Sequence, residues 1–125
     1  MKTIIAGSRN IEDYILVCDA VAESKFTITE VVSGSAKGID QLGERWAKEN
    51  NIPITKFPAD WEKYAKKAGY IRNQKMAKYA DQLILVWDGF SRGSSGMLRT
   101  AYFLGLKVYV KLVSKGGPYA QKKEG

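Results

Sequence analysis

Histidine is absent from the 125-residue sequence, and cysteine occurs once, at Cys18. Structural zinc sites need several cysteine or histidine ligands, and acid–base catalysis most often uses histidine, so both are excluded and we expect no metal site. Cys18 cannot form an internal disulfide, and its place on the apolar face of an expected helix predicts a buried thiol in a reducing compartment. Any catalysis must use carboxylates, hydroxyls, lysine, tyrosine or this thiol.

Long hydrophobic runs are also absent. No apolar segment approaches the roughly 20 residues that a membrane helix requires, and the N-terminus runs straight into a strand-like segment rather than a basic and then apolar leader. We therefore expect a soluble, cytoplasmic protein with no membrane partner.

Acidic residues are in the minority. The chain has 20 Lys and Arg against 13 Asp and Glu, a formal charge of +7 that favours acidic partners such as phosphates or nucleic acid. Several lysines, however, fall where solvated helix surface or a tail explains them, at Lys63, Lys66, Lys67, Lys122 and Lys123. The charge alone is weak evidence for a function.

What is present is typical of one globular α/β domain, since 45% hydrophobic residues in a chain of this length suffice for one continuous core. Apolar, β-branched segments alternate with segments of helical spacing. The expected strands span residues 2–6, 28–33, 53–57, 81–87 and 107–113. The expected helices span residues 11–24, 40–51 and 94–104, with two more within 59–80.

Local signals set the expected ends of these elements. Asn10 precedes the first helix as a candidate cap, and Pro53 favours a place near the sheet edge for the third strand. Gly69 is expected to separate the two helices within residues 59–80, and Gly105 to stop the last helix. That last helix is expected to turn Met97, Leu98, Ala101 and Tyr102 inward.

Strands that alternate with helices imply parallel pairing with right-handed crossovers. We therefore expect a single Rossmann-like, three-layer domain over residues 1–113, with a five-stranded, mainly parallel sheet of order 3-2-1-4-5. Residues 114–125 contain three glycines and three lysines, which predicts a flexible C-terminal tail.

Three loops rich in glycine and serine follow strands that are neighbours in this order, at the edge where open parallel sheets bind ligands. They are Gly7-Ser8-Arg9, residues 33–38 (SGSAKG) and residues 88–95 (DGFSRGSS). Small residues let backbone N–H groups approach an anion, and each loop leads into a helix N-terminus. Arg9, Lys37 and Arg92 add one cation per loop. Turns alone would explain one such loop, but three adjacent loops predict a phosphate site.

Neither common nucleotide fingerprint is present. The second loop lacks both the three-glycine spacing of dinucleotide-binding folds and the Gly-Lys-Ser/Thr ending of a P-loop. Ordinary NAD or ATP use is not predicted, and we expect no cofactor.

Four ordered motifs carry a family resemblance. They are residues 6–9 (AGSR), residues 32–40 (VSGSAKGID), Trp61 with residues 68–76 (AGYIRNQKM), and residues 87–94 (WDGFSRGS). Together they resemble the small YspA-type branch of the SLOG superfamily, which also contains the DNA-processing protein DprA and the LOG nucleotide phosphoribohydrolases. The resemblance covers about residues 1–112. It implies a Rossmann-like fold and a pocket for nucleotides or nucleotide-derived signals, sometimes in phage and bacterial conflict.

The chain departs from its relatives at three positions. Ser35 stands where relatives tend to have a second glycine, and Ser94 where they tend to have threonine. In LOG enzymes a glutamate follows three residues after that threonine or serine, and here the position is Met97. A thioether cannot stabilise a ribosyl cation or activate water as a carboxylate does, which puts the LOG reaction in doubt.

The candidate ligand-binding residues lie within these motifs. They are Gly7, Ser8, Arg9, Ser33, Gly34, Ser35, Lys37, Gly38, Asp40, Trp61, Arg72, Asn73, Asp88, Gly89, Ser91, Arg92, Gly93 and Ser94. The serines are interpreted as donors to phosphate, because no histidine is available to activate a nucleophile. We interpret Trp61 as a lid over a base, although aromatic residues at helical spacing more often belong to a core, and Arg72 as a phosphate or carboxylate partner.

Two carboxylates are candidates for accepting ribose hydroxyls or acting as a base. For Asp40, near a helix start, the capping role is favoured. Asp88 directly follows a buried strand beside the serine-rich loop and is the candidate catalytic residue.

Three functions remain open. The first is binding of a phosphate-bearing nucleotide or nucleotide-derived molecule, which the protein senses or sequesters without being an enzyme. The alternative is a nucleotide hydrolase that cleaves an N-glycosidic or phosphate bond. The second alternative is binding of single-stranded DNA, as in DprA, which ranks lower because the lysines are dispersed. Homo-oligomerisation is plausible, but nothing in the sequence fixes it.

Overall fold

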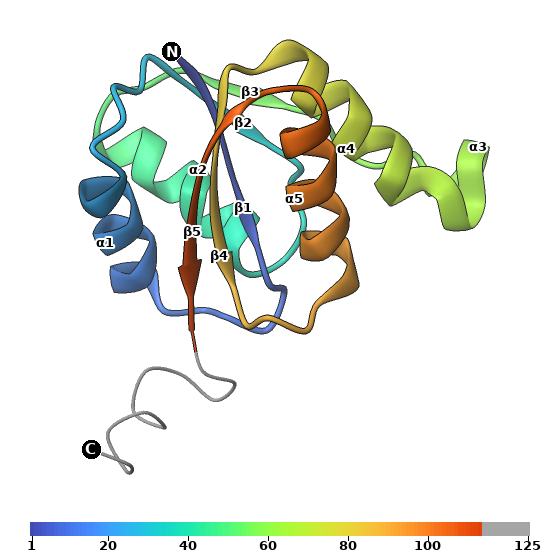
Figure 1. Ribbon diagram of the computed structural model, residues 1–125, viewed down its shortest axis with the longest axis horizontal. Coiled ribbons are helices and arrows are strands. Elements are labelled where there is room, and N and C mark those ends of the chain that lie inside the picture. Colours follow the sequence, from blue (N-terminus) through green and yellow to red (C-terminus); the bar gives the residue numbers. More distant parts are fainter. Residues whose placement is uncertain (114–125) are drawn as a thin grey trace, which may run out of the picture.

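The computed structural model describes residues 1–113, which form a five-stranded parallel sheet of order β3-β2-β1-β4-β5 (Figure 1). The strands are β1 (Lys2–Gly7), β2 (Glu30–Ser33), β3 (Ile54–Lys56), β4 (Gln82–Trp87) and β5 (Lys107–Leu112). In the register, Ile4 of β1 lies between Val32 of β2 and Leu83 of β4. The expected α/β fold class and strand order are confirmed.

Helices cover both faces of the sheet, which gives three layers (Figure 1). One face carries α1 (Tyr14–Ser24) and α2 (Ile39–Glu49), and the other carries α4 (Ala68–Tyr79) and α5 (Arg92–Phe103). The short helix α3 (Trp61–Tyr64) and the 3-10 turn η1 (Ala65–Lys67) precede α4. Among residues 1–113 no helix is both long and apolar enough to span a membrane.

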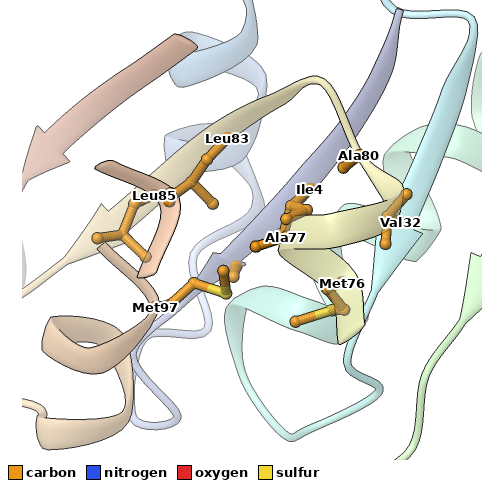
Figure 2. Packing of buried hydrophobic residues seen from close by; sticks show 10 residues of the cluster. Ile4, Val32, Met76, Ala77, Ala80, Leu83, Leu85 and Met97 are labelled. Atoms are coloured by element: carbon orange, nitrogen blue, oxygen red, sulfur yellow. The ribbon is translucent and has the colours of Figure 1, made fainter. Parts of the chain in front are cut away.

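Each face of the sheet has its own hydrophobic core, because side chains alternate along the strands. Ile4, Leu83 and Leu85 point to one face and pack against Met76 of α4 and Met97 of α5 (Figure 2). Ile5, Val31, Ile84 and Val86 point to the other and pack against α1 and α2. Burial on both faces explains why β1 and β4 read as continuous apolar runs in the sequence.

The first helix begins later than predicted. It starts at Tyr14, and its cap is Asp13, whose Oδ1 accepts the N–H of Ile15 at 3.0 Å. The prediction of a cap at Asn10 was wrong, since Asn10 belongs to the preceding turn. The prediction for Cys18 was also wrong in part, because its side chain is only half-buried.

The break within residues 59–80 also lies elsewhere than predicted. Gly69 is inside α4, and the chain turns instead at Ala65, which has a left-handed φ of 50°. α5 extends from Arg92 to Phe103, and Tyr102, predicted to face inward, is 64% exposed. Leu98 does pack against the core, and β3 does lie at the sheet edge after Pro53. The predicted tail, residues 114–125, lies outside the described residues.

Candidate functional site

A cavity of about 770 Å³ opens at the carboxyl ends of the strands, on the side covered by α4 and α5. Its walls come from the loops after β1 and β4, the first turn of α2, and the segments α3 to α5. This is the edge where the predicted loops converge, the lower edge of the sheet in Figure 1. The cavity brings together eleven predicted residues: Gly7, Arg9, Asp40, Trp61, Arg72, Asn73, Asp88, Ser91, Arg92, Gly93 and Ser94.

The other predicted residues do not line the cavity. They are Ser8, Ser33, Gly34, Ser35, Lys37, Gly38 and Gly89. Most residues of the second predicted loop are in this group. Ser33 is buried and donates to Glu44. Lys37, the predicted cation of this loop, is exposed to solvent and outside the lining.

Ser8 joins three loops beneath the cavity. It is fully buried, and its Oγ accepts the N–H of Asp88 at 3.1 Å and lies 3.0 Å from Oγ of Ser91. Its carbonyl oxygen accepts the N–H of Ile39 at 3.3 Å. The hydroxyl predicted to donate to phosphate is therefore committed to holding the loops in place.

The β2–α2 loop is built around Glu44. Its Oε2 accepts the hydroxyls of Ser33 at 2.7 Å and Ser35 at 2.9 Å, and Lys56 lies 3.6 Å from Oε1. Ser35 has a left-handed φ of 59°, which explains why a glycine suits this position. Gly38 has a φ of 77°, and a Cβ there would lie 2.5 Å from the carbonyl oxygen of Ser8, so this tight approach requires glycine.

The first turn of α5 offers backbone donors to the cavity. No hydrogen bond within residues 1–113 uses the N–H groups of Arg92, Gly93 or Ser94, while the N–H of Ser95 bonds to the carbonyl oxygen of Ser91. A Cβ at Gly93 or Gly96 would meet nothing within 4 Å, so a ligand has room to approach the backbone. Free N–H groups and the helix dipole favour an anion at this position.

Positive charge dominates the lining. Four cationic side chains (Arg9, Lys66, Arg72 and Arg92) face two carboxylates, Asp40 and Asp88. Arg9, Lys66 and Arg92 are exposed at the cavity. The loop motifs pointed to two of these cations, but Lys66 was missed, because only the fold of α3 and η1 brings it to the cavity.

Arg72 is fixed by two hydrogen bonds. Its Nη1 donates to the carbonyl oxygen of Gly34 at 2.7 Å, and its Nε donates to Oδ1 of Asn73 at 2.9 Å. Burial lowers the pKa of Arg72, with Asp40 acting in the opposite direction and Arg9 adding repulsion. Nη2 makes no hydrogen bond within residues 1–113 and remains a donor for a ligand.

Asp40 is a buried acid on the cavity wall. It is 5% exposed and lies in the first turn of α2, where its Oδ2 accepts the N–H of Ala36 at 3.2 Å. The cap of α2 is Gly38, so the prediction of a capping role for Asp40 was wrong. Burial raises its pKa to about 6, against the opposing effects of the Ala36 N–H, Arg72 and the Gly7 N–H.

Asp88 organises the turn that leads into α5. Its Oδ1 accepts the N–H groups of Phe90 at 2.8 Å and Ser91 at 2.9 Å and the Ser91 hydroxyl at 3.0 Å. Burial acts to raise its pKa, but these hydrogen bonds outweigh it and hold the pKa below the ordinary value. A carboxylate that is stabilised in its charged form is a weak base. The contacts of Asp88 belong to the turn before α5, whose N-cap is Ser91.

Exposed aromatic rings stand at the rim. Trp61 is 53% exposed, Tyr70 62% and Phe90 77%, and all three line the cavity. Tyr70 and Phe90 lie within the family motifs but were not predicted as ligand contacts, since an aromatic residue in a sequence more often belongs to a core. Exposed rings at a cavity mouth provide stacking surfaces for a planar group.

No group of three or more His, Cys, Asp or Glu residues that would hold a metal ion occurs within residues 1–113. The polar groups in the cavity lining are cations, amides, hydroxyls and two carboxylates.

Comparisons with known proteins identify a family. No solved structure matches the chain. Gene 61 protein of Mycobacterium phage D29 is 33% identical over 117 residues, a match that covers 86% of this chain and 93% of that protein. The model of the YspA, cpYpsA-related SLOG family matches residues 1–64, a range that includes Arg9 and Asp40. Membership of this family suggests a nucleotide-related role in binding or processing. The chain belongs to the YspA, cpYpsA-related SLOG family.

Proposed function

We propose that the protein binds a phosphate-bearing nucleotide or nucleotide-derived molecule in the cavity and senses or sequesters it. The observation that carries this proposal is the first turn of α5, where three backbone N–H groups have no partner within residues 1–113 and Arg92 lies beside them. Such a turn favours phosphate through its dipole and its N–H groups, and a guanidinium adds a two-pronged contact.

The rest of the cavity supports the same ligand class. Its volume of about 770 Å³ falls in the range of roughly 300–1,000 Å³ that is usual for small-molecule sites. Arg9 and the free Nη2 of Arg72 extend the cationic wall, while Trp61 and Tyr70 offer surfaces on which a base stacks. Phosphate and base thus have distinct recognition surfaces in one cavity.

Binding without turnover is favoured by the residue that stands at the position of the LOG enzymes' glutamate. Met97 lies in the cavity lining, is 2% exposed and packs into the core, so an apolar thioether stands at that position. Asp88, the predicted catalytic residue, is held in its charged form by the turn it organises. Neither residue offers the acid or base that bond cleavage requires.

Calorimetry tests the proposal after a thermal-shift screen of nucleotides, cyclic dinucleotides and ADP-ribose derivatives. Arg92→Ala should weaken binding of a hit by at least tenfold, since contacts between charged groups contribute about 1.5–3 kcal/mol. Arg99→Ala is the matched control, because Arg99 is exposed on the same helix outside the cavity lining and should leave affinity unchanged. A blank screen, or equal losses in both variants, would contradict the proposal.

A second candidate function, hydrolysis of a nucleotide bond, is favoured by Asp40. A buried carboxyl with a pKa of about 6 beside a cationic wall is the kind of group that serves as an acid or base near neutral pH. Chromatography of a bound nucleotide after incubation would reveal a released base or phosphate. Loss of this release in Asp40→Asn but not in Asp88→Asn would make the protein an enzyme, whereas an intact ligand would leave binding as its function.

A further inference from the structure

We propose that Asp40 makes the site specific for ligands that carry free sugar hydroxyls, by accepting hydrogen bonds from the 2′- and 3′-hydroxyl groups of a ribose. This inference rests on the proposed function, because it names the part of the nucleotide that the α2 wall recognises. It concerns the more buried of the two carboxylates in the cavity lining.

The first step concerns what Asp40 is able to bind. A carboxylate accepts hydrogen bonds and repels phosphate, so its partner in the cavity must be an uncharged donor or a cation. Its two oxygens provide about four acceptor positions. Within residues 1–113 two backbone donors act on it, the N–H of Ala36, which bonds to Oδ2, and the N–H of Gly7. Acceptor capacity therefore remains for a ligand.

The second step concerns Arg72, the nearest candidate for neutralising Asp40. A Cβ at Gly34 would lie 2.5 Å from Nη1 of Arg72 and 2.8 Å from Oδ2 of Asp40, so both groups reach the space beside Gly34. The ion pairs within residues 1–113, counted to a separation of 4.0 Å, do not include these two residues. Nη1 and Nε instead donate to Gly34 and Asn73. Arg72 therefore stabilises the negative charge of Asp40 electrostatically but donates no hydrogen bond to it.

The third step compares the two carboxylates of the lining. Asp88 has Oδ1 filled by three donors from its own turn and is half-buried. Asp40 is 5% exposed and is held on a regular helix whose next turn packs on β1 through Gly43. A buried acceptor without a donor costs the full free energy of its desolvation. Asp40 should therefore lower the affinity for an analogue that lacks the hydroxyls.

The experiment uses the four ribonucleoside 5′-monophosphates and 5′-diphosphates with their 2′-deoxy and 2′,3′-dideoxy counterparts as probes, measured by calorimetry at pH 7.5. For the wild type, the dideoxy probe of the best-bound nucleotide should bind at least tenfold more weakly than the ribonucleotide. In Asp40→Asn this ratio should fall to within about twofold, while binding of the dideoxy probe persists. Asp19→Asn is the control, because Asp19 is exposed on α1 outside the cavity lining, and it should keep the wild-type ratio.

A second measurement avoids dependence on the variant's folding. The wild-type ratio should decrease at pH 5, because protonation leaves Asp40 with one acceptor fewer and turns it into a donor. The charged groups facing this carboxyl are Arg72 of α4 and Glu44 of α2, with Arg9 acting on Arg72 from the β1–α1 loop. Equal ribo and dideoxy affinities in the wild type would overturn the inference and leave the proposed function standing. Failure of every probe to bind, together with a blank screen of cyclic dinucleotides and ADP-ribose derivatives, would remove both.

Discussion

The backbone N–H of Asp88 donates a hydrogen bond of 3.1 Å to Oγ of Ser8, which joins two loops whose residues lie 80 positions apart in the sequence. Asp88 in turn accepts the N–H groups of Phe90 and Ser91 through its side chain. The end of β1 therefore positions the turn that precedes α5. The geometry of the candidate phosphate site depends on a serine that does not itself line the cavity.

Ser8→Ala should destabilise the protein by about 1–3 kcal/mol. The change removes the acceptor of the Asp88 N–H. Ser8 is fully buried, so the lost hydrogen bond leaves a buried polar group without its partner. Urea denaturation followed by circular dichroism measures the loss. Ser95→Ala is the control, because its hydroxyl only accepts a 3.4 Å contact from exposed Arg99, and we expect a change within about 0.5 kcal/mol. Equal effects would show that Ser8 does not hold the loops together.

Gly34→Ala should lower stability by about 1–3 kcal/mol. The new Cβ would lie 2.5 Å from Nη1 of Arg72, so the guanidinium must swing away and give up its hydrogen bond to the Gly34 carbonyl. Gly96→Ala is the matched control. Nothing lies within 4 Å of its added Cβ, and alanine stabilises a helix interior by about 0.5–1 kcal/mol. Thermal melting of both variants should therefore shift in opposite directions, and a shared direction would contradict this account.

The fold was predictable because local and global signals agree in this sequence. Buried parallel strands give continuous apolar runs such as residues 82–87, and glycine ends several of these runs. The errors arose where a local signal had more than one physical solution. Asn10 and Asp13 are both good caps, and only the packing of α1 decides between them. Gly69 is a common helix breaker, yet Ala65 carries the left-handed turn.

The candidate site was predictable at the level of loops and not of individual roles. Glycine and serine after neighbouring strands located the cavity edge, because parallel strands bring their carboxyl ends together. The roles of Asp40 and Asp88 could not be assigned, since capping depends on which N–H groups a carboxylate reaches in three dimensions. Lys66 lies outside the motifs, and the motif that contains Tyr70 does not show which way its side chain faces. Both residues reach the cavity only through the path of α3, η1 and α4.

Substitutions at Ser35 should separate backbone strain from hydrogen bonding. Ser35→Ala keeps the left-handed φ of 59° and loses the bond to Glu44, so we expect a loss of about 1–2 kcal/mol. Ser35→Gly loses the same bond but removes the cost of a Cβ in that conformation, about 1–2 kcal/mol. It should therefore remain close to the wild type in chemical denaturation. A glycine variant as unstable as the alanine variant would show that strain is negligible here.

The two cavity carboxylates should give the stability of the protein opposite dependences on pH. Burial raises the pKa of Asp40 from 3.8 to about 6, so the folded state binds this proton more tightly than the unfolded state. Its contribution to stability is full below pH 3.8 and is lost as the pH rises through about 6. By linkage, the wild type should lose about 2 kcal/mol relative to Asp40→Asn between pH 4 and pH 7.

The contribution of Asp88 to stability should depend on pH in the opposite direction to that of Asp40. The turn around Asp88 holds its pKa below the ordinary value, so its contribution is present above pH 4 and is lost as the pH falls. The stability of the wild type relative to Asp88→Asn should therefore decrease on acidification, while that relative to Asp40→Asn increases. Urea denaturation of the three proteins at intervals between pH 3 and pH 7.5 measures both slopes. Slopes of the same sign would contradict the opposite pKa shifts of the buried Asp40 and the hydrogen-bonded Asp88.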